Sequence, residues 1–380
     1  MHTISKPRRK PGSLSLLIAM AVFAALAFAV QASAQRIITF DVPGAGTGPG
    51  QGTYAFEILP TGAIIGYSVD AYGVSHGFLR APDGAATTID APNAGRGAGQ
   101  GTFAVSVNPR GTAQGYYVDH AGVAHGYLRT PKGEFTTFDV PGSGSRPGQG
   151  TFAGNIDPAG AITGDYVDVN GVFHGFVRNP DGRIVTFDAP GSGNGAGQGT
   201  VDATVSALNS EGTTTGWCTE PSGHFHGWMR TRDGVITTFE APGAGPDPGQ
   251  GTGELSINDA GAVVLWIQDA HFVIHGGVRT PNRQVMQFDA PDAGAGASQG
   301  TAPQTINARG AITGYYLDSN YAYHGFLRTP DGIITEFDVA GASTKGGLGT
   351  LAMTINPLDA ITGYYFDTNG TAHGFVRMPW

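Results

Sequence analysis

Residues 101–140 read GTFAVSVNPRGTAQGYYVDHAGVAHGYLRTPKGEFTTFDV, and this stretch decides the fold. It divides into four short runs rich in Val, Tyr, Phe and Thr, at 101–108, 112–119, 123–129 and 134–140. Gly, Pro, Asp and Asn separate the runs. Runs of this length and composition, bounded by turn residues, predict β-strands. We therefore expect four strands joined by tight turns, and the rest of the chain after residue 34 shows no helical period.

The same unit occurs seven times along the chain. Each copy carries His-Gly, usually followed by an aromatic residue, and an Arg four positions after the His. The His positions lie 49 residues apart except for one spacing of 52. Each copy also contains a run like TTFD that ends on an acid. The seven motifs, which number the copies in order, start at His76, His125, His174, His226, His275, His324 and His373. Four strands at this period predict one blade of a β-propeller.

The two ends of the repeat array predict how the propeller closes. The array begins on a fourth strand at 37–42 and ends on a third strand at 373–377. Pairing of these two strands would complete the seventh blade and leave no open sheet edge. An open β-solenoid is the alternative, but it would need atypical capping repeats at both ends, and none is visible. We expect an all-β, seven-bladed propeller of four-stranded blades over residues 35–380.

The first 34 residues have the features of a secretory signal peptide. Four cations precede an apolar run from Leu14 to Val30, and Ala-Ser-Ala at 32–34 resembles a cleavage site. An uncleaved membrane anchor is the alternative interpretation. We expect residues 1–34 to be removed and the protein to be secreted or extracytoplasmic, in the periplasm, on the cell surface or outside the cell. No later stretch is apolar enough to span a membrane.

Charge and cysteine content restrict the partners. Removal of residues 1–34 takes away four cations and no acids, so the net charge falls from −9 to −13. Such an acidic chain does not favour nucleic acid or an anionic membrane surface. Cys218 is the single cysteine, so no intrachain disulfide is possible. We expect a monomer held together by packing and strand pairing.

The repeat motif resembles that of the extracellular HAF-repeat family of bacteria. The shared elements are G-V-x-H-G-F-L-R, F-D-A-P-G-A and G-x-I-T-G-Y-Y-x-D, and they cover the chain after residue 34. The His-Ala-Phe tripeptide of the family stands here as His-Gly-Phe in four copies, and the fifth copy loses the aromatic residue. The resemblance implies a repeat fold and an exported location, but no reaction.

The repeated polar residues have a structural and a functional interpretation. His76, Phe78 and Arg80 alternate along one strand, so they share a face. We predict that such His and Arg side chains form hydrogen bonds inside their own blade, for example to the acid of the TTFD run, because buried polar groups need partners. A ring of metal ligands or anion binders is the alternative. We assign no metal site and no catalytic residue.

A second set of acids follows the second strand of each copy. We interpret these acids as turn residues, although carboxylates at one rim could also gather calcium, the one cofactor considered. The set is Asp70, Asp119, Asp168, Glu220, Asp269, Asp318 and Asp367.

Glycine-rich connections such as VPGAGTGPGQGT at 42–53 join successive copies. No helix follows them, so a phosphate-binding loop is excluded by context. They should lie on one face together with the turns after the second strands, and loops on a rigid scaffold are where binding usually occurs. We therefore predict a binding rim that carries a recurring glutamine. These residues are Gln51, Gln100, Gln149, Gln198, Gln250 and Gln299.

The fourth copy departs most from the repeat, because it holds the three extra residues and several unusual side chains. Trp217, Glu220, His224 and Trp228 are added to the predicted binding set on this ground. Paired Trp residues can stack on sugar rings, while the alternative is that they are core aromatics that fill a wider blade. Cys218 lacks an orienting third group, so it is not assigned as a nucleophile.

Three functions remain open at this point. The preferred one is a secreted, non-enzymatic binding module that recognises a glycan or a partner protein at the rim of the glycine-rich loops. The second is a lyase or hydrolase that acts on extracellular polysaccharide at the central channel, which would need an asymmetric cluster of acid, base and electrophile. The third is a purely structural surface protein. A propeller fold does not decide among them.

Overall fold

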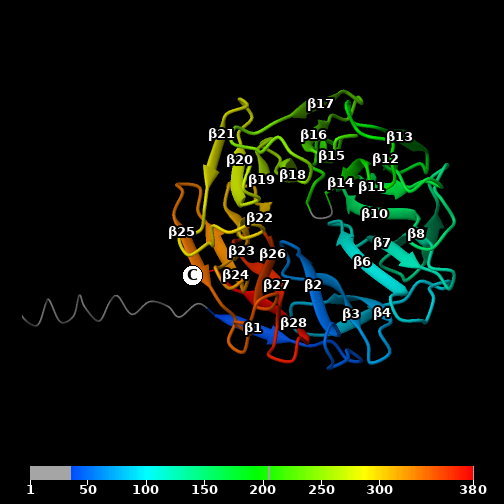
Figure 1. Cartoon of the computed structure of the whole chain (residues 1–380). Coiled ribbons are helices and arrows are strands. Elements are labelled where there is room, and N and C mark those ends of the chain that lie inside the picture. Colours follow the sequence, from blue (N-terminus) through cyan, green and yellow to red (C-terminus); the bar gives the residue numbers. More distant parts are fainter. Residues whose placement is uncertain (1–35, 204–205, 380) are drawn as a thin grey trace, which may run out of the picture. The chain divides into compact units, whose positions relative to one another are not determined.

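Short strands with β-branched and aromatic residues, interrupted every few residues by Gly, Pro and Asp turns, produce an all-β ring (Figure 1). The computed structural model describes residues 36–203 and 206–379, and it contains 28 strands and no helix in these ranges. The predicted signal peptide lies outside the described residues. Residues 37–379 form one compact unit.

Each repeat contributes four strands at equivalent positions. The first strands, which lie nearest the centre of the ring in Figure 1, are β2 (Gly52–Ile58), β6 (Gly101–Val107), β10 (Gly150–Ile156), β14 (Gly199–Asp202), β18 (Gly251–Ile257), β22 (Gly300–Ile306) and β26 (Thr350–Ile355). The second strands are β3 (Ile64–Val69), β7 (Ala113–Val118), β11 (Ile162–Val167), β15 (Thr214–Thr219), β19 (Val263–Gln268), β23 (Ile312–Leu317) and β27 (Ile361–Phe366).

The outer half of each unit is built in the same way. The third strands are β4 (Ser75–Arg80), β8 (Ala124–Arg129), β12 (Phe173–Arg178), β16 (Phe225–Arg230), β20 (Ile274–Arg279), β24 (Tyr323–Arg328) and β28 (Ala372–Arg377). The fourth strands, at the outside, are β1 (Ile37–Phe40), β5 (Ala86–Ile89), β9 (Phe135–Phe138), β13 (Ile184–Phe187), β17 (Ile236–Phe239), β21 (Val285–Phe288) and β25 (Ile334–Phe337).

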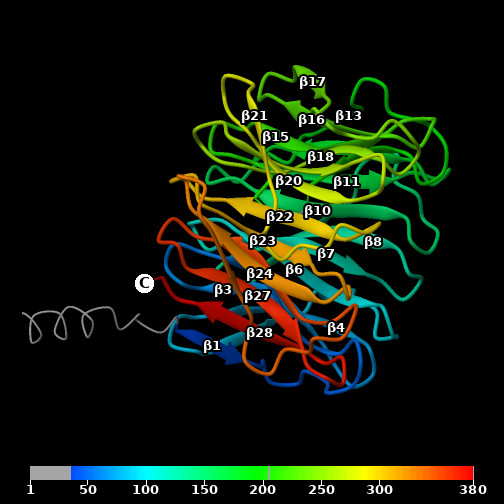
Figure 2. The same ribbon diagram turned by 60° about the vertical axis from the view of Figure 1, so that its left-hand side comes forward.

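Antiparallel pairing joins the four strands of a repeat into one sheet. In the second copy β6 pairs with β7, β7 with β8 and β8 with β9. The last sheet contains the predicted closure, because β1 pairs with β28 from Ile37 opposite Arg377 to Phe40 opposite Gly374. The tilted sheets succeed one another around the axis (Figure 2). The predictions of an all-β propeller and of strand closure between the two ends are confirmed.

The packing between neighbouring sheets explains the repeated motif. The Phe138 ring lies against Gly126 of its own sheet, where an added Cβ would stand 2.5 Å from the ring. The Arg178 guanidinium of the next sheet lies over the same ring, 5.1 Å from its centroid. A phenylalanine of the TTFD run thus contacts the glycine of one copy and the arginine of the next. Five more Arg–Phe pairs of this kind recur around the ring.

The fourth copy differs locally. Its first strand, β14, ends at Asp202, whereas the other first strands continue for three further residues. Beyond the undescribed residues 204–205, Ser206 has a positive φ of 53° and Leu208 forms an isolated bridge with Thr214. The described residues contain no helix long and apolar enough to cross a membrane.

Candidate functional site

The repeated histidines are part of the scaffold. His76 lies between two carboxylates of its own sheet, with Nδ1 2.9 Å from Asp90 and Nε2 3.5 Å from Asp70. Five other copies repeat this Asp–His–Asp arrangement, and in the last sheet His373 reaches Asp41 of β1 at 3.0 Å. The predicted structural role of the histidines, with the acid of the TTFD run as partner, is confirmed.

The acids after the second strands are turn residues, as predicted. One Asp70 oxygen accepts hydrogen bonds from the backbone N–H groups of Tyr72 and Val74, at 2.8 and 2.9 Å. Partial burial acts to raise the pKa of Asp70, but these hydrogen bonds and the facing His76 outweigh it and hold the pKa below its usual value. The pKa is lowered in the same way at Asp119, Asp168, Asp269, Asp318 and Asp367.

A second group of acids has shifts of the opposite sign. Burial raises the pKa of Glu57, Asp202 and Glu254 to about 7. Burial and then the nearby Asp202 charge raise the pKa of Asp165 as well. Asp202 is enclosed among polar neighbours, since its carboxylate accepts hydrogen bonds from Asn155, Thr163 and Thr214 at 2.9–3.1 Å.

These shifts predict a stability maximum in mildly acidic solution. An acid with a raised pKa contributes stability that is complete below about pH 4 and is lost as the pH rises through about 7. The turn aspartates contribute stability that is complete above about pH 4 and is lost as the pH falls through their depressed values. We expect the free energy of unfolding, measured by urea titration between pH 3 and 9, to peak between pH 4 and 6. A maximum above pH 7 would contradict this assignment.

The six glutamines of the predicted binding rim are used inside their own loops. The Gln51 Oε1 accepts a hydrogen bond from Gly48 N at 2.8 Å, and its Nε2 donates to the Ala71 carbonyl oxygen at 3.2 Å. All six Oε1 atoms accept from a loop N–H group, and Gln100, Gln198, Gln250 and Gln299 also repeat the bond to a carbonyl. Gln149, Gln250 and Gln299 are buried. In five copies this amide ties the glycine-rich loop to the next turn, so the prediction that it contacts a ligand receives no geometric support.

The two tryptophans of the fourth copy lie in different environments. Trp228 is fully buried and contacts the ring of Phe187 at 5.2 Å between centroids, so its predicted part in ligand binding is wrong. The core alternative describes it correctly. Trp217 is half-buried and lies opposite Val201 of the first strand β14. Trp217 therefore keeps its place in the candidate site.

Trp217 belongs to a set of aromatic residues that the structure gathers around the axis. The residue after the glycine of a TGYY-like run lies opposite a residue of the first strand, so these cross-strand pairs share one face. Examples are Tyr67 opposite Tyr54, Tyr116 opposite Phe103 and Tyr364 opposite Leu351. The rings of Tyr364, Tyr54, Tyr67, Phe103, Tyr116 and Phe152 follow one another with centroids 4.8–5.1 Å apart. Together with Trp217, Trp266 and Tyr315, these half-buried side chains are called here the aromatic girdle.

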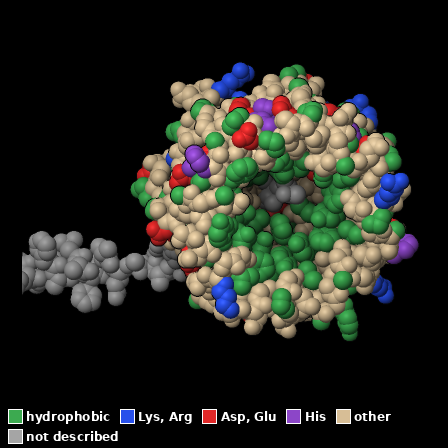
Figure 3. Space-filling model, viewed as in Figure 1, with side chains coloured by type: hydrophobic (Ala, Val, Ile, Leu, Met, Phe, Trp, Pro, Cys, Tyr) green, Lys and Arg blue, Asp and Glu red, His purple; other side chains and the backbone are tan. Residues whose placement is uncertain are grey.

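The girdle residues belong to the two inner strands of each repeat, which surround the axis in Figure 1. Figure 3 shows a hollow in the middle of one face, and its wall is largely hydrophobic. Phe56 is also half-buried on an inner strand, and its ring stacks on that of Tyr67 with centroids 5.5 Å apart. Burial, followed for Tyr116 by the Asp165 charge, raises the pKa of Tyr116 and Tyr315 to about 12. Their hydroxyl groups therefore stay protonated and can donate hydrogen bonds.

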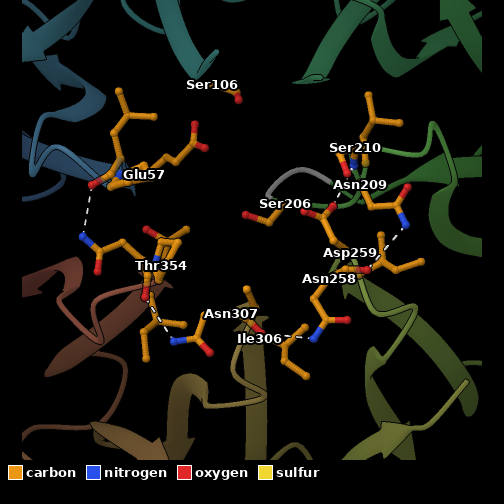
Figure 4. A pocket seen from close by; sticks show the side chains of 18 of the residues that line it. Glu57, Ser106, Ser206, Asn209, Ser210, Asn258, Asp259, Ile306, Asn307 and Thr354 are labelled. Atoms are coloured by element: carbon orange, nitrogen blue, oxygen red, sulfur yellow. Dashed lines mark hydrogen bonds between the residues drawn. The ribbon is translucent and has the colours of Figure 1, made fainter. Parts of the chain in front are cut away.

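The other end of the inner strands forms a cavity of about 250 Å³ that is lined by both polar and apolar side chains (Figure 4). Asparagines at the ends of first strands link adjacent repeats around it. Asn209 donates to the Asn258 carbonyl, Asn258 to that of Asn307, and Asn307 to that of Asn356, at 3.1–3.4 Å. Glu57 also lines the cavity. Because the asparagine amides hold the ring together, we assign this end to the scaffold.

Sequence reasoning missed most of the aromatic girdle. It selected Trp217 as a departure from the repeat, but it did not gather the tyrosines of the TGYY runs into one surface. The signal was present, because an aromatic residue occupies this position in six copies and Asp165 in the third. Glu220 and His224, also in the predicted set, lie on the outer part of the fourth copy next to Glu240, away from the aromatic girdle.

Comparisons with known proteins concern the fold. No model of a known protein family and no curated protein matches the sequence. A prolyl endopeptidase structure superposes with a TM-score of 0.55 at 10% identity, over 96% of this chain and 55% of its own. The chain thus spans about half the length of that endopeptidase. The BP39L lectin from Burkholderia pseudomallei superposes with a TM-score of 0.55 at 13% identity, over 85% of this chain and 93% of the lectin.

Proposed function

We propose that this chain is a secreted, non-enzymatic seven-bladed β-propeller of the HAF-repeat type that binds a glycan at the aromatic girdle. The seven sequence copies and the four-stranded sheet built from each support the blade number. The charged start, apolar run and small residues of the first 34 positions support export. The proposed site moves from the rim of the glycine-rich loops to the axis.

The observation that carries the proposal is the girdle itself. The girdle rings are only partly buried, so each keeps some accessible surface, and Tyr and Trp combine a flat apolar surface with a polar group. A pyranose offers the matching features, an apolar face of C–H groups and a rim of hydroxyls. A concave site with aromatic walls and few polar groups is the usual form of a small-ligand site. The high negative charge favours a neutral glycan over an anionic one.

The same geometry weighs against the hydrolase or lyase alternative. A general acid needs a raised pKa and access to the substrate. Asp202 has the raised pKa, but Asn155, Thr163 and Thr214 occupy its oxygens. Asp165 is also buried, at 9% exposure, and the carboxylate beside it is that of Asp202, whose oxygens already accept three hydrogen bonds. The similarity of this chain to the two solved structures supports the propeller scaffold. It does not decide between glycan binding and catalysis, which experiment must do.

Binding should depend on the girdle tryptophans. We expect the chain from residue 35 to bind a neutral oligosaccharide class on a glycan array, with a change in tryptophan fluorescence. Trp217→Ala or Trp266→Ala should weaken the selected oligosaccharide about 30-fold, which corresponds to the roughly 2 kcal/mol typical of a central contact residue. Isothermal titration calorimetry measures both affinities.

Tyr72→Ala is the matched control, because Tyr72 is 82% exposed in a turn outside the girdle and its loss should leave the affinity unchanged. Equal weakening by Tyr72→Ala would place binding at the rim instead. A blank array would reject the glycan and favour a protein partner or a structural role. Product formation from the bound oligosaccharide would favour the enzyme.

A further inference from the structure

The outer part of the fourth copy contains a cluster that the other copies lack. Both acids that flank the repeat histidine are lengthened by one methylene, to Glu220 and Glu240, where other copies have aspartate. Two residues before His226 stands His224, where four copies have a buried valine. The scaffold folds with valine at this position, so packing does not require the second imidazole.

These substitutions bring three potential metal ligands together. The Glu240 Oε2 atom lies 2.9 Å from His224 Nε2 and 2.6 Å from His226 Nδ1. The three ligand atoms all lie within 4.8 Å of one another. In a tetrahedral zinc site with bonds of about 2.0–2.1 Å the ligand atoms are about 3.3 Å apart. A shift of less than about 1 Å in these side chains would therefore admit the ion.

The surrounding contacts orient the ligands as in known metal sites. The other nitrogen of His226, Nε2, lies 2.8 Å from Glu220 Oε1, so a carboxylate fixes the ring with Nδ1 toward Glu240. The other oxygen of Glu240 accepts a hydrogen bond from the Thr252 hydroxyl at 2.7 Å, which leaves Oε2 for the ion. Such outer carboxylate–histidine contacts hold metal ligands in place and increase their basicity.

The burial of the cluster also suits an ion. The His224 and His226 side chains are 11% and 24% exposed, and that of Glu240 is 36% exposed, so the cluster is open to solvent on one side. In the free protein two imidazoles share one carboxylate oxygen. A divalent cation would satisfy all three groups at once, and it would counter the charge of Glu220 and Glu240. Among the described residues this is the one group of three or more such side chains with metal-binding spacing.

We infer that His224 Nε2, His226 Nδ1 and Glu240 Oε2 bind one Zn²⁺ ion, with Glu220 as the carboxylate that positions His226. The two nitrogens and one oxygen match the ligand preference of zinc, and the solvent-facing side supplies the fourth position to water or to an external ligand. Three protein ligands with a fourth position left to water or substrate is the coordination of catalytic zinc sites. The proposed glycan site lies elsewhere, so either proposal stands without the other.

The test uses the full chain from residue 35, freed of metal by chelation. We expect it to bind one equivalent of Zn²⁺ in competition with a chromophoric chelator and to give the visible absorption of tetrahedral Co²⁺. His224→Val should reduce the zinc affinity more than about 100-fold, beyond the 10–100-fold typical of outer contacts, while Glu220→Gln should fall within that range.

Two further variants make the result decisive. His271→Ala is the matched control, because His271 is 86% exposed beside Asp269 and its removal should leave zinc binding unchanged. Glu240→Gln keeps the side-chain shape and should abolish binding even if His224→Val folds poorly, which circular dichroism reports. No stoichiometric binding by the unmodified chain, or equal binding by Glu240→Gln, would overturn the proposal.

Discussion

Deletion of residues 37–42 should unfold or aggregate the protein at temperatures where the full chain is stable. These residues contain β1, which covers the edge of β28 in a four-residue antiparallel register. Val42 is buried in a cluster with Phe78 and Val376, and Ile38 and Phe40 pack against the same cluster. Burial of a large apolar side chain contributes about 1.5–3 kcal/mol, so the lost strand should cost on the order of 5 kcal/mol.

The deletion also removes partners that bridge the two ends of the chain. His373 loses the Asp41 carboxylate at 3.0 Å, and Arg80 loses the Phe40 ring, whose centroid lies 4.4 Å from its guanidinium carbon. The uncovered edge of β28 would offer unpaired backbone groups to other molecules, which promotes aggregation. Chemical unfolding and light scattering measure the two effects.

Two controls separate strand closure from general damage. Thr39→Ala changes an exposed side chain of the same strand and should leave stability within about 0.5 kcal/mol. A synthetic peptide of residues 36–45 should restore stability to the shortened chain in a concentration-dependent way, because binding to the folded state shifts the unfolding equilibrium. An unchanged melting temperature after deletion would show that β1 does not close the ring.

The fold was predictable because the repeat supplies the same information seven times. Each turn and strand was visible in residues 101–140, and β6 to β9 lie inside the four predicted runs. The pairing of β1 with β28 followed from the strand at which the array begins and ends. Local periodicity could not give the packing partners. The contacts of the Phe138 ring with Gly126 and Arg178 appear only when two repeats are brought together.

The site was less predictable, for a physical reason. Alternation along a strand tells which residues share a face, but not which of the two faces reaches the axis. Trp217 and Trp228 looked equivalent in sequence, yet one lies in the aromatic girdle and the other in the core. The glutamines looked free because their loop partners are backbone atoms, which sequence does not reveal. That the side chains of His224 and His226 lie on the same side could have been predicted, since residues two apart share a face of a strand.

The second large effect concerns that buried tryptophan. Trp228 is 0% exposed, faces Gly216 across the sheet and meets the Phe187 ring edge-on. Trp228→Ala should leave a cavity that the surrounding strands cannot fill, at a cost of about 3–5 kcal/mol in the free energy of unfolding. Urea titration measures this loss. The glycan affinity of the folded fraction should be unchanged, because Trp228 is fully buried and is not part of the aromatic girdle.

Trp228→Phe distinguishes lost packing from a specific need for tryptophan. Four other copies carry phenylalanine at this position, and Phe78, Phe176, Phe326 and Phe375 are also buried. The smaller ring should lose about 1 kcal/mol of packing. The Trp228 Nε1 group finds no hydrogen-bond acceptor among the described residues, so its removal should recover part of the 1–3 kcal/mol that such burial costs. We therefore expect Trp228→Phe to lie within about 1 kcal/mol of the unmodified protein. A loss as large as that of Trp228→Ala would mean that the indole makes an interaction that phenylalanine cannot replace.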